Sequence, residues 1–170
     1  MSQAKNKTGK VIILGNSGAG KSTLAKVMAR KYNLTHLDLD TLAWKNTNPP
    51  TRKTLKESTP LIDQFIESNE HWVIEGCYAD LLQHTIDNGN PHELIFLNPD
   101  IETCINNCRN RAWEPHKYKS ADEQNSNLDM LINWVKQYPN REDDFSLKMH
   151  RKLFSEFTGK KSEYNKVVID

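Results

Sequence analysis

A glycine-rich segment near the start of the chain constrains the fold more than any other feature of the sequence. It follows a short apolar run at residues 10–14 and reads Gly15-Asn16-Ser17-Gly18-Ala19-Gly20-Lys21-Ser22-Thr23. Apolar residues then recur at helical spacing up to about Lys31, before Tyr32 and Asn33. A buried strand, a glycine-rich turn and a helix, in this order, predict the opening unit of a parallel α/β sheet.

The spacing of this segment matches the Walker A pattern completely, from Gly15 through Gly20 and Lys21 to Ser22. Glycines let successive backbone amides turn inward around an anion, and the following helix presents the positive end of its dipole. We therefore expect residues 15–23, called the phosphate loop below, to hold nucleotide phosphates, with the Lys21 ammonium at the β- and γ-phosphates. The Ser22 hydroxyl is the expected Mg²⁺ ligand, and Thr23 can support the α-phosphate.

The rest of the sequence continues to alternate strands and helices, which predicts a parallel sheet with right-handed crossovers. We expect further strands at residues 35–40, 71–76, 93–97 and 166–169, and helices at 79–87, after Pro99, from a capping box at Ser120, and at about 146–157. Thr59 followed by Pro60 predicts the start of one more helix. The 170 residues contain no repeat and fit one domain, residues 1–170.

Composition argues against several other classes of protein. No run approaches the roughly 18 apolar residues of a membrane span, and the polar residues 1–10 lack the apolar core of a secretory signal. Lys and Arg number 23 against 22 Asp and Glu, so a net charge of +1 gives no general attraction to nucleic acid. Three irregularly placed cysteines (Cys77, Cys104, Cys108) argue against a disulfide framework and favour a reducing cytoplasm. Cys104 and Cys108 with His116 lack the spacing and the fourth ligand of a metal site.

Two aspartates end the second predicted strand. Asp38 and Asp40 are two residues apart, so in a strand both side chains point to the same face. Ligands of open α/β sheets bind at the carboxyl ends of the strands, where these acids lie. One can hold an acceptor hydroxyl and take its proton while the other supports Mg²⁺ through water. We assign the acceptor to Asp40, which is nearer the phosphate loop, and the metal to Asp38; a loop-capping role without chemistry is the alternative.

Other candidate residues surround the predicted acceptor position. Glu75 ends the third strand, where it could hold Mg²⁺ through water or orient a nucleophile, and Gly76 lets backbone approach a ligand closely. A structural Glu75 bonded to loop amides is the alternative. Trp44 and Trp113 flank the acceptor region and the next basic segment, and either could wall a substrate pocket or simply pack.

A basic segment at about residues 109–125 is the predicted lid. Phosphoryl transfer needs cations that neutralise the transferring group as the site closes. We assign this role to Arg109 and Arg111, while Arg141 and Arg151 could join them from later helices. A solvated positive face is the alternative for all four arginines.

These segments resemble a known group of proteins. The loop GNSGAGKS, the LDLD of residues 37–40, the end of strand three and the arginine-bearing lid are similar to the small P-loop kinases of the nucleoside, shikimate and gluconate kinase type. The closer similarity is to the adenylate-kinase-related topology-modulation (FlaR-type) proteins. Their LDxLxW and WIIDGNY segments correspond to residues 39–44 and 72–78 here, although the family's strand-three aspartate is Glu75 in this chain.

The resemblance implies a P-loop NTPase fold: three α/β/α layers around a five-stranded parallel sheet of order 2-3-1-4-5, with a small lid. It also implies binding of ATP and Mg²⁺ and transfer of the γ-phosphoryl group, and it carries Lys21, Ser22, Asp40 and the lid arginines to functional positions.

The sequence therefore predicts a cytoplasmic ATP- and Mg²⁺-dependent phosphotransferase. Its expected partners are ATP and a small acceptor bearing a hydroxyl or a phosphate, with neither membrane nor nucleic acid. The candidate acceptor-binding residues are Asp38, Asp40, Trp44, Glu75, Gly76 and Arg141. Two alternatives stay open: a P-loop NTPase without an organic acceptor, in which Glu75 polarises water, and a nucleotide-dependent regulatory protein.

Overall fold

A five-stranded parallel sheet forms the centre of the computed structural model, which describes residues 9–47 and 50–166. The strand order is β2-β3-β1-β4-β5, as predicted. The strands are β1 (Lys10–Gly15), β2 (Thr35–Asp38), β3 (Trp72–Gly76), β4 (Glu93–Leu97) and β5 (Lys160–Tyr164).

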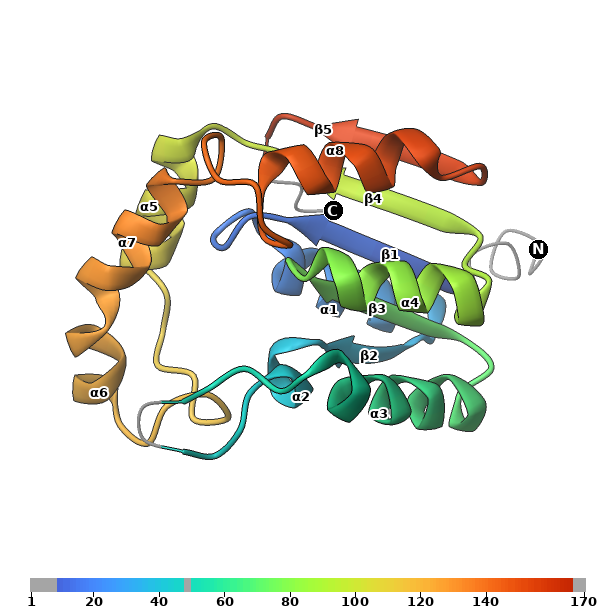
Figure 1. The fold of residues 1–170 in the computed structure, drawn as a ribbon, viewed down its shortest axis with the longest axis horizontal. Coiled ribbons are helices and arrows are strands. Elements are labelled where there is room, and N and C mark those ends of the chain that lie inside the picture. The colour runs from blue at the N-terminus through green and yellow to red at the C-terminus, as the bar shows by residue number, and fades with distance from the viewer. Residues whose placement is uncertain (1–8, 48–49, 167–170) are drawn as a thin grey trace.

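Helices cover both faces of the sheet, which gives the predicted three layers (Figure 1). They are α1 (Lys21–Tyr32), α2 (Asp40–Ala43), α3 (Leu55–Ser68), α4 (Ala79–Gly89), α5 (Ile101–Arg109), α6 (Ala121–Ser126), α7 (Leu128–Lys136) and α8 (Leu147–Glu156). Among the described residues, no helix is both long enough and apolar enough to cross a membrane.

The central strand β1 supplies both halves of the core. Ile12 and Leu14 pack in a cluster with residues of α3, α4 and α8, while Val11 and Ile13 pack in a second cluster with residues of α1, α5 and α7. All four side chains are fully buried. Strand alternation therefore explains why a continuous apolar run is needed here, since each successive side chain enters a different layer.

The predicted start of α3 is wrong by several residues. The helix begins at Leu55, and Thr54 caps it: the Thr54 hydroxyl accepts from the Glu57 amide at 3.2 Å, and the Glu57 carboxylate accepts from the Thr54 amide at 3.1 Å. This reciprocal capping box satisfies amides at the helix start. Pro60 consequently lies inside the helix instead of opening it.

The second and fifth strands also differ from the prediction. β2 ends at Asp38, and Asp40 is already the first residue of α2. β5 occupies Lys160–Tyr164, a polar edge strand with mostly exposed side chains, whereas residues 167–169 of the predicted strand lie outside the described residues. An edge strand pairs with one neighbour only, and its side chains are less covered by helices. It therefore does not need the continuous apolar run from which we predicted the fifth strand.

A buried histidine ties α8 to the loop that follows β3. His150 is fully buried, with Nε2 at 2.8 Å from the Cys77 carbonyl oxygen and Nδ1 at 2.6 Å from the Tyr138 hydroxyl. A carbonyl only accepts, so Nε2 carries the proton, and Tyr138 donates to Nδ1. Burial lowers the pKa of His150 to about 4, which keeps the ring neutral.

This histidine should make the protein acid-sensitive. The unfolded chain protonates His150 near its ordinary pKa of 6.5, and the folded chain only near 4, so stability should fall as the pH is lowered through this window. The expected loss is on the order of 3 kcal/mol between about pH 7 and about pH 4. His150→Gln, which does not titrate, should show a shallower acid slope in urea unfolding. Equal slopes would contradict the assignment.

Candidate functional site

The phosphate loop turns at the carboxyl edge of the sheet, between β1 and α1. Gly18 and Gly20 have φ angles of 81° and 96°, in the left-handed region that favours glycine. A Cβ atom on Gly18 would also collide with the Cys104 carbonyl oxygen of α5. The glycines of this loop, Gly18 outside the Walker A positions included, therefore meet two physical requirements, backbone conformation and close approach to a neighbouring helix.

Hydrogen bonds to two helices that are distant in sequence hold this loop in place. The Asn107 amide on α5 donates to the Gly18 carbonyl at 2.8 Å, and the Asn16 amide donates to the Val135 carbonyl on α7 at 3.3 Å. The Asn16 side-chain oxygen in turn accepts from the Ser17 amide at 2.9 Å. The loop is thus preorganised by contacts that lie about as far as two-thirds of the chain away in sequence.

The last residues of the phosphate loop contact the end of β3. The Ser22 hydroxyl donates to Glu75 Oε2 at 2.6 Å, and His36 Nε2 lies 2.9 Å from the same oxygen. The Lys21 ammonium donates to the Asn16 carbonyl at 2.7 Å. Glu75 is 1% exposed, so its carboxylate is held at this position by buried polar contacts.

The two aspartates converge although they do not share a strand. Asp38 ends β2, and its Oδ1 accepts from the Asp40 amide at 2.9 Å, which turns the chain into α2. Both carboxylates then reach the same cation: Lys117 Nζ lies 2.7 Å from Asp40 Oδ2 and 3.3 Å from Asp38 Oδ2. The two carboxylates therefore lie together at Lys117, and a side-chain-capped turn brings them there instead of strand alternation.

A hydrogen-bond chain fixes the Asp40 carboxylate. Trp44 Nε1 donates to the Tyr78 hydroxyl at 2.8 Å, and Tyr78 donates to Asp40 Oδ1. An indole N–H can only donate, so the tyrosine proton points at Asp40. Burial alone would raise the pKa of Asp40, but Lys117 and Tyr78 outweigh it and hold the pKa below its usual range. Burial, Glu75 and Asp40 instead raise the pKa of Asp38.

Asp40 and the phosphate loop line one cavity of about 670 Å³, whereas Asp38 and Tyr78 are not among its lining residues. The lining residues come from the phosphate loop, from the start of α2 and the end of β3 (Asp40, Glu75, Gly76, Cys77), and from residues 110–117 between α5 and α6, which fall within the predicted lid. Figure 1 shows this loop running from α5 down toward the α2 end of the sheet before α6 begins. The cavity therefore joins the predicted phosphate site to the predicted acceptor acid.

The predicted lid and tryptophan residues are divided between the cavity and the surface. Arg111 and Trp113 line the cavity, and Arg111 pairs with Glu114 at 3.4 Å. Arg109 is exposed at the end of α5 and is not among the lining residues. Trp44 is also not a lining residue and acts on the site through Tyr78.

The later arginines lie away from the cavity walls. Arg141 pairs with Asp143 at 2.7 Å and stacks on Trp134, with its guanidinium 4.4 Å from the ring centre. Arg151 pairs with Glu163 at 3.3 Å. The three cysteines are free and buried, and no group of three or more His, Cys, Asp or Glu side chains in residues 9–47 and 50–166 could hold a metal ion.

Sequence reasoning missed His36, Tyr78 and Lys117. His36 precedes Asp38 by two residues, so strand alternation would have placed it on the same face of the sheet as Asp38. Tyr78 lies in the WVIEGCY segment that carried the resemblance. Lys117 lies inside the predicted lid, but only the fold shows which of its cations reaches the aspartates.

The parallel sheet of order β2-β3-β1-β4-β5 and the loop between β1 and α1 define a P-loop NTPase fold. Residues 11–131 match the AAA domain family, and the chain belongs to that family. A relative in Bacillus subtilis (strain 168), the uncharacterized protein YqaC, is 34% identical over 133 residues, 75% of this chain and 71% of the relative.

Two further similarities concern kinases. An adenylate kinase of Wigglesworthia glossinidia brevipalpis is 34% identical over 58 residues, which cover 34% of this chain and 28% of that enzyme. A gluconokinase from Sinorhizobium meliloti 1021 superposes with a TM-score of 0.56 over 92% of this chain and 83% of that one, at 14% identity. The structural similarity shows that the two chains share a fold.

The hydrogen-bond chain at Asp40 can be tested by removing one hydroxyl. Tyr78→Phe deprives Asp40 of a donor and leaves the Trp44 N–H without its acceptor, so we expect a loss of about 1–3 kcal/mol in unfolding free energy. Tyr164→Phe, at an exposed tyrosine on β5, should change stability by less than about 0.5 kcal/mol. Equal effects in chemical denaturation would contradict the role of the Tyr78 hydroxyl.

Proposed function

We propose that the protein is an ATP- and Mg²⁺-dependent kinase that transfers the γ-phosphoryl group to a hydroxyl of a small molecule. One observation carries this proposal: the phosphate loop and the Asp40 carboxylate line the same cavity, under a lid that contains cations. Three free, buried cysteines support a reducing, cytoplasmic setting.

The phosphate loop would bind the nucleotide. The backbone amides of residues 18–22 and the start of α1 offer an anion site, and the Lys21 ammonium can exchange the Asn16 carbonyl for a phosphate oxygen. Such an exchange favours binding because the loop is already held by Asn16 and Asn107.

The residues around Ser22 fit a magnesium ion. Mg²⁺ in phosphoryl-transfer sites keeps several waters and takes few protein ligands, so it needs no cage of side chains. The Ser22 hydroxyl would bind it directly, and Glu75 and Asp38 would hold its waters, because both carboxylates lie at adjacent strand ends. When bound, the ion neutralises charge on the β- and γ-phosphates.

Asp40 is the proposed acceptor-binding base. Its carboxylate would accept the hydrogen bond of the acceptor hydroxyl and take the proton as the oxygen bonds to the γ-phosphorus. The bond between the γ-phosphorus and the bridging oxygen breaks at the same time, and ADP leaves. Of the two predicted lid arginines, Arg111 lines the cavity and Arg109 does not. We therefore assign the role near the transferring group to Arg111.

Hydrolysis without an organic acceptor is the second candidate function. The observation that favours it is the buried Glu75, whose carboxylate lies on the cavity wall beside Ser22 and could orient a water. Its Oε2 is already engaged by Ser22 and His36, which suits a ligand-holding role better.

Transfer of labelled phosphate separates the two functions. Purified protein is incubated with γ-labelled ATP, Mg²⁺ and pooled nucleosides, nucleotides, sugars and hydroxy acids. We expect label in an organic product with the wild type and none with Lys21→Ala, because the variant lacks the cation at the β- and γ-phosphates. Label released only as inorganic phosphate would favour hydrolysis.

Substitution of Asp40 tests the assignment of the base. Asp40→Asn keeps the size of the side chain but cannot take a proton, so transfer should fall by about 10²–10⁴-fold. The affinity for a fluorescent ATP analogue should fall by no more than about threefold, since Asp40 lies on the acceptor side. A near-normal transfer rate would move the role to Glu75, and Glu75→Gln is then the variant to measure.

A further inference from the structure

One lysine of the lid occupies the position expected for the acceptor. Lys117 Nζ lies 2.7 Å from Asp40 Oδ2, 3.2 Å from Glu114 Oε2 and 3.3 Å from Asp38 Oδ2. Its side chain is 17% exposed. Three carboxylates thus surround a single ammonium at the junction of the lid, β2 and α2.

With this contact, both oxygens of the Asp40 carboxylate already have a donor. Oδ1 accepts from Tyr78, whose proton direction is fixed by Trp44, and Oδ2 accepts from Lys117. An acceptor hydroxyl donates its hydrogen to a carboxylate oxygen, and the Lys117 ammonium competes with it for Oδ2. The docked Lys117 therefore competes with an acceptor for Asp40 and makes its carboxylate a weaker base.

The surroundings of Lys117 also hold the ammonium in its charged form. Burial by itself lowers the pKa of Lys117, but the charges of Asp40, Asp38 and Glu114 outweigh this effect and raise it. Lys117 therefore remains a cation at any pH near neutrality, and it keeps this charge when the lid moves.

Bound nucleotide would offer this cation a second partner. Lys117 lines the same cavity as Lys21 and the phosphate loop, and a lysine ammonium sits on a flexible four-carbon stem. The phosphates bring several negative charges into that cavity, in a site partly shielded from water. They compete with Asp40 for the Lys117 ammonium.

We propose that Lys117 is a catalytic residue with two positions: it latches the lid onto Asp38 and Asp40 while the phosphate loop is empty, and it moves to the transferring phosphoryl group when nucleotide binds. The second position rests on the proposed kinase function; the latch rests on the contacts alone. Lys117 gives up no proton in either position. Its departure from Asp40 Oδ2 frees that oxygen for the acceptor hydroxyl, so nucleotide binding should strengthen acceptor binding.

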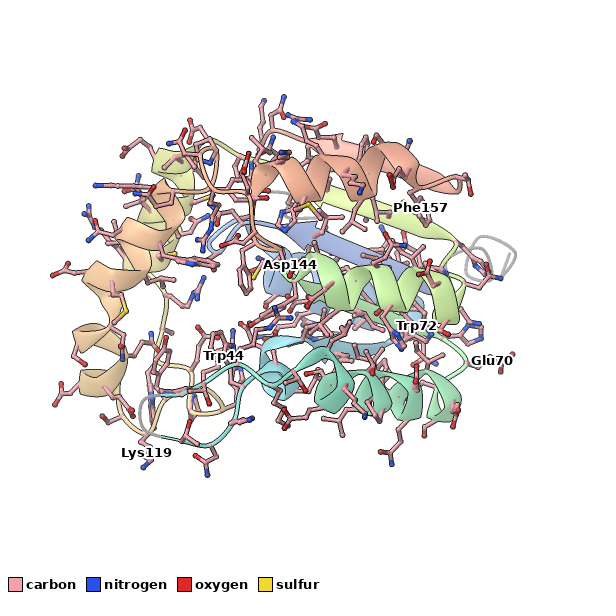
Figure 2. All side chains as sticks on the ribbon, viewed as in Figure 1. Trp44, Glu70, Trp72, Lys119, Asp144 and Phe157 are labelled. Atoms are coloured by element: carbon pink, nitrogen blue, oxygen red, sulfur yellow. The ribbon has the colours of Figure 1, made fainter. Side chains whose placement is uncertain are left out.

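The latch can be tested without any nucleotide. Lys117→Met keeps the length and apolar stem of the side chain but removes the charge. Lys119→Met is the matched control in the same loop: Lys119 is exposed, and Figure 2 shows it at the outer edge of the molecule. The measurement is amide hydrogen exchange across residues 111–119, where the Lys117 and Tyr118 amides both donate to the Glu114 carbonyl.

We expect exchange in this segment to become about tenfold faster in Lys117→Met, because three carboxylates lose their shared cation. Asp40→Asn, which weakens the same contact from the other side, should show a smaller increase. Lys119→Met should exchange as the wild type does. Lid exchange in Lys117→Met that equals the Lys119→Met control would overturn the latch.

The second position is tested with nucleotide. Once the labelled-ATP screen has given an acceptor, Lys117→Met should lose at least about tenfold in kcat at saturating ATP and acceptor, and Lys119→Met should not. An unchanged kcat would limit Lys117 to the latch. A wild type that labels no acceptor would contradict the kinase function, and the exchange result would still decide the latch.

Discussion

The double-sided burial of β1 determines where everything else in the site lies. Val11 to Leu14 alternate between two helical layers, so the strand must run through the middle of the sheet. The phosphate loop therefore emerges at the carboxyl edge with strand ends on both sides: β3 supplies Glu75, and β4 approaches Gly15 so closely that a Cβ there would meet the Leu97 carbonyl. Position in the sheet, more than loop sequence, brings acids and phosphate loop together.

Charge balance is the second organising constraint. Asp38, Asp40, Glu75 and Glu114 gather within one half-enclosed region, and carboxylates that are close and partly buried repel one another unless cations or donors compensate. The Lys117 ammonium compensates three of these carboxylates, those of Asp38, Asp40 and Glu114. Tyr78 also donates to Asp40, and Ser22 and the His36 ring contact Glu75. In the proposed nucleotide site, phosphates would enter this balance of charges and compete for its cations.

Much of the fold was predictable because its signals are local. The apolar run at residues 10–14 is typical of a buried strand, and the glycine spacing after it is typical of an anion-binding turn. The start of α3 was missed because Thr59-Pro60 and Thr54-x-x-Glu57 are both valid openings, and the reciprocal capping box forms at Thr54. β5 was missed because a polar edge strand has no apolar pattern to detect.

The sequence by itself determined the phosphate loop, the strand order through its resemblance to small P-loop kinases, and the presence of acids at the ends of β2 and β3. The tertiary structure decided which cation meets those acids. Of the basic residues between 109 and 119, Lys117 reaches Asp40, Arg111 pairs with Glu114, and Arg109 faces solvent. The physical reason is that the lid has no periodic pattern: its path depends on where α5 ends and α6 begins, and contacts across the cavity, not spacing along the chain, select the residue.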